Sequence, residues 1–274
     1  MTSIWKQANL TCPLCQLPLQ AIETQDTPLT IKTLSCDLNH SFDIGKPGYL
    51  HLVPVQSKRS KEPGDNKDMV AARKRFLNKG FYQPISEGLN KLIGQQISTL
   101  PKEDSQSTLQ ILDLGCGEGY YTAELMTQDK QDQSDASGQT ITSDQVLVYG
   151  LDISKIAIQQ AAKRHSDIIW LVANSNKIPL PDNSVDIIFS VFSPIVPSES
   201  LRILKPNGLL ITATAESTHL LSLRQEIYVE VRDYNNDKLE KQLTPQFQLI
   251  SANTIHHSLR LTESEDVLDL LHMT

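Results

Sequence analysis

Residues 111–119 read Ile-Leu-Asp-Leu-Gly-Cys-Gly-Glu-Gly, and this stretch is the strongest indication of the fold class. An apolar run typical of a buried parallel strand ends in Asp113, and glycines follow at alternate positions: Gly115, Gly117 and Gly119. Alternate glycines allow a sharp turn and let a ligand lie against the main chain, although a purely structural turn would need the same residues. Because Asp113 and Glu118 are acidic, the loop favours a cationic ligand over the phosphates of a dinucleotide.

Four segments further along the chain also have the composition of buried strands. They are residues 145–152, 168–172, 185–192 and 209–214. Helical stretches such as residues 155–165 separate them, and strands that alternate with helices predict a parallel sheet with helices on both faces. Asp152 ends the second strand as Asp113 ends the first, so the α/β fold carries acids at the ends of two strands.

This order of strands, glycines and acids resembles the class I S-adenosylmethionine-dependent methyltransferases, which have a Rossmann-like sheet. The resemblance implies cofactor contacts by Asp113, Gly115, Gly117, Glu118 and Asp152. In that family the second acid accepts hydrogen bonds from both ribose hydroxyls, a role that requires a carboxylate. The family contacts the adenine just after the third strand, where this chain has Ala173-Asn174-Ser175.

Length and composition limit the alternatives. The 274 residues suffice for one large or two modest domains, and 39% hydrophobic residues suffice for a core. No run of about 18 apolar residues exists, so we expect no membrane span. The N-terminus has no signal-peptide core, from which we expect a cytoplasmic protein. The net charge of −7 argues against a chain that coats nucleic acid indiscriminately.

Three cysteines and a histidine near the N-terminus have the spacing of a metal site. The pattern is C-x2-C followed by C-x3-H, and the residues are Cys12, Cys15, Cys36 and His40. Three thiolates and one imidazole form a closed tetrahedral site, which suits structural zinc and leaves no position for a catalytic water. The alternative is three reduced core cysteines and a surface histidine. We expect a small unit that depends on its metal but is independent of the methyltransferase core.

A basic segment follows the cysteine-rich unit. From Lys58 to Lys79 there are eight Lys or Arg residues and three Asp or Glu residues, which gives +5 within an acidic protein. The loop carrying Lys58, Arg59 and Lys61 could follow a phosphate backbone without reading bases. Alternatively, these charged residues only form a water-exposed loop and one water-exposed helix face, and bind no ligand.

Several motifs together resemble the 23S ribosomal RNA guanine-N1 methyltransferases, from about residue 10 to the C-terminus. They are Cys12-Pro-Leu-Cys15, Cys36 with His40, Gly48-Tyr49, Lys58-Arg59-Ser60, Pro63-Gly64-Asp65, Phe81-Tyr82-Gln83-Pro84 and residues 114–122. The family methylates N1 of one guanine in a hairpin of the large-subunit RNA. The resemblance implies zinc on the four Cys and His ligands, and it places Tyr82 and His219 at the S-adenosylmethionine. Two other functions stay open: a small-molecule methyltransferase, and a zinc-stabilised RNA-binding protein without turnover.

The resemblance also predicts how the chain is divided. We expect a zinc-binding RNA-recognition module in residues 1–55, a basic loop and helical linker in residues 56–105, and the methyltransferase domain in residues 106–274. The target guanine must be unstacked, and Tyr120, Tyr121 and Phe192 are candidates to stack on it, although each could equally be core. The residue that accepts the N1 proton is not identified.

Two regions depart from the family pattern. Residues 128–145 are polar and read as a disordered surface insertion. Residues 246–252 and 254–261 suggest a long sixth strand, and residues 263–271 suggest a short amphipathic helix. The family continues through a seventh strand, so we expect a truncated chain with an open sheet edge, reduced stability and a tendency to form a homodimer along that edge.

Overall fold

The structure is a computed structural model, which describes residues 4–23, 30–54, 63–97, 108–127, 146–231 and 236–273. Two sequence-based expectations fall outside these ranges. Lys58, Arg59 and Lys61 of the basic loop lie outside the described residues, and so does the expected insertion at residues 128–145.

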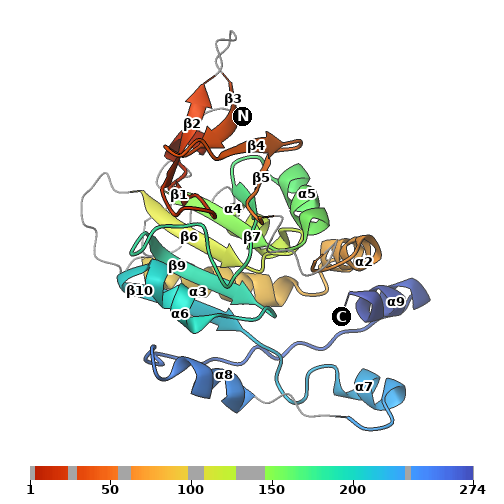
Figure 1. The fold of residues 1–274 in the computed structure, drawn as a ribbon. Coiled ribbons are helices and arrows are strands. Elements are labelled where there is room, and N and C mark those ends of the chain that lie inside the picture. The colour runs from red at the N-terminus through yellow and green to blue at the C-terminus, as the bar shows by residue number, and fades with distance from the viewer. Residues whose placement is uncertain are drawn as a thin grey trace.

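Within the described ranges the strands form one ten-stranded sheet, in the order β1-β2-β3-β4-β5-β8-β7-β6-β9-β10 (Figure 1). The half of this sheet that ends at β10 is parallel and is called the central sheet below. It comprises β6 (Leu109–Leu114), β7 (Val146–Asp152), β8 (Ile169–Val172), β9 (Val185–Val191) and β10 (Leu204–Ala213). All five strands predicted from buried apolar runs therefore form, and they are parallel as predicted. The fold is the α/β class expected from the sequence.

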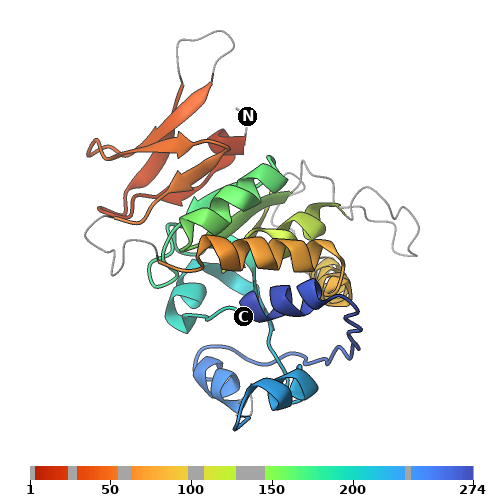
Figure 2. The ribbon, with the colours of Figure 1, turned by 90° about the vertical axis from the view of Figure 1, so that its right-hand side faces the viewer.

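The N-terminal strands are antiparallel and continue directly into the parallel sheet. They are β1 (Leu10–Thr11), β2 (Pro18–Glu23), β3 (Ile31–Ser35), β4 (Ser41–Gly45) and β5 (Tyr49–His51). Strand β5 pairs antiparallel with β4 and parallel with β8, so that Leu50 lies opposite Leu171. The strands β1 to β4 project from one end of the central sheet (Figures 1 and 2).

Alternate residues of the central strands feed two apolar layers, one on each face of the sheet. Helices α3 (Gln83–Ile97), α4 (Tyr120–Thr127) and α5 (Lys155–Arg164) contribute to the layer that contains Ile111, Val148 and Trp170. Helix α6 (Pro197–Ile203), the short helix α1 (Ile4–Gln7) and the N-terminal strands contribute to the opposite layer. In that layer Cys12, Leu34 and Leu50 pack with Leu112, Leu171 and Ile178.

The N-terminal unit and the methyltransferase core are therefore joined in structure, which argues against the expected independence of the unit. The unit supplies an edge strand to the central sheet and shares one of its two apolar layers. The division after residue 55 stays a proposal about function, since β5 on one side of it and β8 on the other are neighbours in one sheet.

The last part of the chain differs from the sequence-based expectation in one element. The strands expected at residues 246–252 and 254–261 do not form: this stretch is irregular, and Leu249 and Ile250 are largely exposed. Apolar alternation forms a strand only where a neighbour satisfies its backbone groups, and β10 pairs only with β9 within the described ranges. Two short helices, α7 (Leu221–Ile227) and α8 (Asn236–Leu243), lie along this last part of the chain.

The expected C-terminal helix does form, as α9 (Ser264–His272), and it lies beside α2 (Lys67–Asn78) (Figure 2). Arg75 of α2 donates from Nε to Oδ2 of Asp269 over 2.9 Å, and Lys79 pairs with Asp266. Two of the cations counted in the basic segment are thus engaged by acids of the same chain. No helix within the described part of the chain is long and apolar enough to cross a membrane.

Candidate active site

The glycine-rich loop follows β6 at the carboxyl edge of the parallel strands. Gly115, Gly117 and Gly119 have φ angles of +80°, +56° and +80°, a region that favours glycine. A Cβ on Gly115 would lie 1.9 Å from Ser193 Oγ, and one on Gly119 would lie 2.6 Å from a Trp170 ring atom. On Gly117 the nearest atom would be 3.5 Å away. The first and third glycines are thus required by packing, whereas a Cβ on Gly117 would only make an ordinary van der Waals contact with the Arg73 side chain.

Asp152 lies directly against this loop. The Gly117 N–H donates to Asp152 Oδ2 over 3.0 Å, and the Ser154 N–H donates to Oδ1 over 2.7 Å. Burial raises the pKa of Asp152, and these two backbone hydrogen bonds act in the opposite direction. The structure therefore brings together the two acid-bearing loops that the sequence predicted to form one site.

Two further carboxyl groups lie buried beside Asp152. Asp113 is fully buried and accepts a hydrogen bond from the Thr122 hydroxyl over 2.5 Å. Its burial raises its pKa to about 8, and the nearby Asp152 and Glu118 add to this effect. Glu118 is also buried, which raises its pKa, while Arg164 lies 3.5 Å away and opposes the shift. A site that holds three carboxyl groups against desolvation favours a cationic ligand.

An aromatic cluster adjoins the glycine loop. Tyr82 Oη lies 3.5 Å from His219 Nε2, and the Phe192 ring centroid lies 6.1 Å from that of Tyr82 and 5.8 Å from that of His219. Burial lowers the pKa of His219, so its imidazole is neutral near pH 7. The next residue after Phe192 is Ser193, whose hydroxyl rests on Gly115. Tyr82 and His219 are therefore neighbours, as expected of two residues at one ligand.

Sequence reasoning assigned no role to the segment Pro63-Gly64-Asp65, which contacts this site. The Ser154 hydroxyl donates to the Asp65 carbonyl over 2.8 Å, and a Cβ on Gly64 would lie 2.9 Å from Ser154 Cβ. The Asp65 side chain pairs with Arg73, which also donates to the Met273 carbonyl over 2.8 Å. The glycine in the motif was the available signal, because its φ of +81° and its close approach both exclude a side chain.

The four predicted metal ligands converge, although they come from two separate turns. Their donor atoms all lie within 4.8 Å of one another, with Cys15 Sγ 3.6 Å from Cys36 Sγ and Cys36 Sγ 3.4 Å from His40 Nδ1. A tetrahedron with Zn–S bonds of about 2.3 Å has edges of about 3.8 Å, so the cluster fits zinc. Burial raises the Cys36 pKa, but hydrogen bonds from His40, Leu38 and Cys15 outweigh it and bring the pKa to about 7. None of the four cysteines of the chain, which are these three and Cys116, forms a disulfide.

The parallel sheet, the glycine loop and the paired acids define a class I S-adenosylmethionine-dependent methyltransferase. Residues 105–266 match the family model described as "Methyltransferase domain", and residues 10–61 match a zinc-ribbon model described as "RlmA, N-terminal". The chain belongs to the 23S rRNA (guanine-N1)-methyltransferase family, as its relatives show.

Two relatives carry this assignment. The 23S rRNA (guanine(748)-N(1))-methyltransferase of Streptomyces fradiae is 30% identical over 254 residues, which cover 92% of this chain and 80% of the relative. A protein of Bacillus subtilis (strain 168), provisionally named as a 23S rRNA (guanine-N(1)-)-methyltransferase, is 30% identical over 89% of this chain and 76% of the relative. At 92% and 89% of this chain, both matches are too long to lie within the methyltransferase core alone.

Proposed function

We propose that this protein transfers the methyl group of S-adenosylmethionine to N1 of a guanine in 23S ribosomal RNA. The observation that carries the proposal is the match to the Streptomyces fradiae enzyme over 92% of the chain, which includes both the zinc unit and the core. A methyltransferase that acted on a small molecule would have no evident use for the zinc unit and the basic loop.

The proposed cofactor site lies at the carboxyl edge of β6, β7 and β8. Asp152 accepts hydrogen bonds from the ribose hydroxyls, since its carboxylate is already oriented by two backbone N–H groups. Gly117 and Glu118 contact the cofactor from the loop, above Asp113 and Gly115. The turn at Asn174 contacts the adenine, and Tyr82 with His219 covers the methionine end.

We propose that the four clustered side chains Cys12, Cys15, Cys36 and His40 hold a structural zinc ion. Their thiolate and imidazole donors match its preferences, and the closed set leaves no position for a reacting water. The metal would therefore shape the N-terminal unit and take no part in methyl transfer.

Among the three aromatic candidates for stacking, the structure favours Phe192. Tyr120 is buried, and the hydroxyl of Tyr121 is buried as well, whereas 43% of Phe192 is exposed. Phe192 also has a φ of +52°, which is costly for an aromatic residue and is typical of functional sites. Its ring could hold an unstacked guanine between the aromatic cluster and the glycine loop.

Methyl transfer mainly requires that guanine N1 and the methyl group be aligned. S-adenosylmethionine supplies an electrophilic methyl group when it is bound. The protein holds guanine N1 in line with the sulfur–methyl bond, so that the N1–carbon bond forms as that bond breaks. S-adenosylhomocysteine is the leaving group, and the N1 proton passes to water. Fixing both partners in one site supplies most of the rate enhancement, and the stacking platform and the ribose carboxylate perform this fixing.

The raised pKa values predict a pH-dependent cofactor affinity. A bound sulfonium favours the ionised forms of Asp113, Glu118 and Asp152, so binding releases protons and tightens as pH rises toward about 8, the pKa of Asp113 in the free protein. Each proton released changes affinity by up to about tenfold per pH unit. Titration calorimetry in two buffers of different ionisation enthalpy measures the release. S-adenosylhomocysteine, which lacks the sulfonium charge, should show a weaker dependence, and equal dependence for both ligands would contradict the assignment.

We propose that Lys58, Arg59 and Lys61 bind the RNA backbone. The chain on either side of their loop supports this: the Leu52 N–H donates to the Val172 carbonyl over 2.8 Å, and Asp65 is bonded to Ser154. Both ends thus lie at the sheet edge that holds the proposed cofactor site.

Replacing all three cations by glutamine should weaken RNA binding and reduce the slope of log affinity against log salt by up to about three. Filter binding at several salt concentrations measures both quantities. Replacing Lys155 and Lys163, exposed cations on α5, with glutamine provides a matched control. A salt slope that is unchanged in the triple variant would show that the loop is only solvated.

Transfer from labelled S-adenosylmethionine to undermodified 23S ribosomal RNA tests the proposed function. Label in RNA supports it. Label only in small molecules would support the small-molecule alternative, and RNA binding without any transfer would support a binding protein without turnover.

The remaining expectations are also proposals. Residues 1–55 recognise RNA, residues 56–105 link the two sites, and residues 106–274 bind the cofactor. The protein acts in the cytoplasm, where ribosomal RNA is found. The outer edge of β10, which has no partner strand among the residues the structure describes, favours a homodimer, and sedimentation at several concentrations would measure it.

A further inference from the structure

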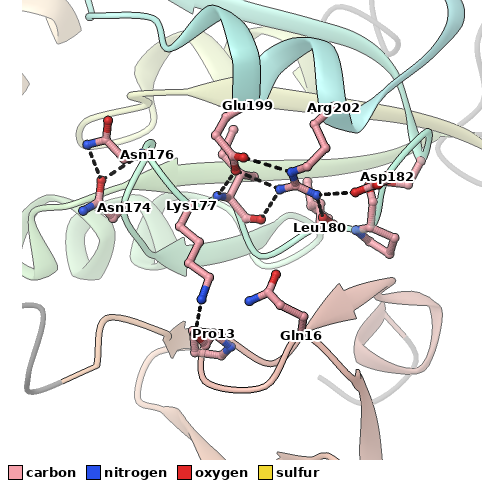
Figure 3. Close-up of polar contacts among 12 residues, drawn as sticks. Pro13, Gln16, Asn174, Asn176, Lys177, Leu180, Asp182, Glu199 and Arg202 are labelled. Atoms are coloured by element: carbon pink, nitrogen blue, oxygen red, sulfur yellow. Dashed lines mark hydrogen bonds and ion pairs between the residues drawn. The ribbon is translucent and has the colours of Figure 1, made fainter.

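The loop that follows β8, residues 173–182, is held by the zinc unit on one side. The Thr11 N–H donates to the Pro179 carbonyl over 3.0 Å, and Lys177 Nζ donates to the Pro13 carbonyl over 2.9 Å. Figure 3 shows the Lys177 side chain reaching from this loop to the turn that contains Pro13 and Gln16. Pro13 lies between Cys12 and Cys15, so its carbonyl is part of the metal-binding turn.

Helix α6 holds the same loop from the other side (Figure 3). Glu199 accepts a hydrogen bond from the Ile178 N–H over 2.8 Å. Arg202 donates to the carbonyls of Ile178 and Leu180, each over 2.8 Å, and also pairs with Glu199. These contacts fix residues 178–180 to the core, and the turn at residues 174–177 comes directly before them.

That turn is closed by Lys177 itself. The Lys177 N–H donates to the Asn174 carbonyl over 3.0 Å, and the Asn176 N–H donates to Asn174 Oδ1 over 2.9 Å. One residue thus closes the turn at Asn174 with its backbone and bonds the metal-binding turn with its side chain. A charge-assisted bond of this kind is stronger than a neutral one.

We propose that Lys177 is a positioning residue that couples the zinc-binding turn at Cys12–Cys15 to the cofactor-binding turn at Asn174. The inference rests on the proposed function, which assigns the adenine to that turn. With zinc bound, the Pro13 carbonyl is fixed because Cys12 and Cys15 on either side of it are ligands. The Lys177 ammonium group, which donates to this carbonyl, is then fixed as well. Zinc and S-adenosylmethionine then strengthen each other's binding, since coupling between two sites is reciprocal.

The test compares the wild type with Lys177→Met, which keeps the length of the side chain but removes its donor. Lys177 is exposed, so the substitution leaves the core unchanged; Lys163→Met, at an exposed position of α5, is the matched control. Two quantities are measured on the zinc-loaded proteins: the rate of zinc transfer to a chromogenic chelator with and without saturating S-adenosylmethionine, and cofactor affinity by calorimetry.

We expect S-adenosylmethionine to slow zinc loss about fivefold or more in the wild type and in Lys163→Met, the lower end of typical coupling. In Lys177→Met this protection should disappear and cofactor affinity should fall by a similar factor. Equal protection in Lys177→Met, or no protection in a wild type that does bind cofactor, overturns the coupling. A wild type that binds no S-adenosylmethionine overturns the proposed function instead.

Discussion

Removing the zinc ligand His40 by His40→Ala is expected to destabilise the whole fold as well as the N-terminal unit. The metal-binding turns carry Cys12 and Cys36, which pack in the same apolar layer as Leu112 and Leu171 of the central strands. Structural zinc contributes on the order of 10 kcal/mol to the folding of small units. A loss of only about 3 kcal/mol would lower the melting temperature by roughly 10 °C for a chain of this size.

Scanning calorimetry with and without added zinc measures this effect, and His257→Ala, an exposed histidine outside the cluster, is the control. The variant should melt at a lower temperature, bind less than one zinc per chain and bind S-adenosylmethionine more weakly. If the N-terminal strands unfold in His40→Ala while the core melts at the wild-type temperature, the expected coupling of the two parts through one sheet is contradicted.

Asp152→Ala should weaken S-adenosylmethionine binding by about 2 kcal/mol, or roughly thirtyfold. The substitution removes the proposed partner of the ribose hydroxyls. It also removes the acceptor of the Gly117 and Ser154 N–H groups, although the Gly115 and Cys116 N–H groups still join the glycine loop to the Leu151 carbonyl of β7. Calorimetry measures the cofactor affinity, and filter binding should show unchanged affinity for RNA.

Asp152→Asn is the matched variant, because it keeps the size of the side chain and one carbonyl acceptor but removes the charge. We expect its cofactor affinity to lie between those of the wild type and the alanine variant. Cofactor affinity equal to that of the wild type in Asp152→Ala would remove this residue from the site.

The parts of the fold that could be predicted are those that depend on the pattern of residues within a short stretch of sequence. Buried parallel strands are continuous apolar runs, so β6 to β10 were identified without knowledge of their partners. The spacing of glycines, acids and cysteines likewise predicts a turn or a binding site without knowledge of distant residues. Strand β5 has only three residues, and its pairing with β8 spans more than a hundred residues, so no local pattern revealed that the zinc unit is built into the central sheet.

The fate of the charged and apolar residues near the C-terminus was less predictable. Arg75 and Lys79 counted as part of a basic surface, but their partners Asp269 and Asp266 lie nearly two hundred residues away along the chain. Counting charge along a sequence cannot detect such neutralisation. The alternation in residues 246–261 suggested a strand, yet a strand is defined by its neighbour, and none is paired with this described stretch.

The position of the transferred methyl group distinguishes N1 methylation of ribosomal RNA from every other methyl transfer. Undermodified 23S ribosomal RNA is incubated with the protein and S-adenosylmethionine, and its nuclease fragments and nucleosides are analysed by mass spectrometry. We expect 1-methylguanosine at a single guanine within a hairpin, with Asp152→Ala giving the same product more slowly at limiting cofactor. Methyl groups on the exocyclic nitrogen of guanine, on the ribose, or on no nucleoside at all would contradict it.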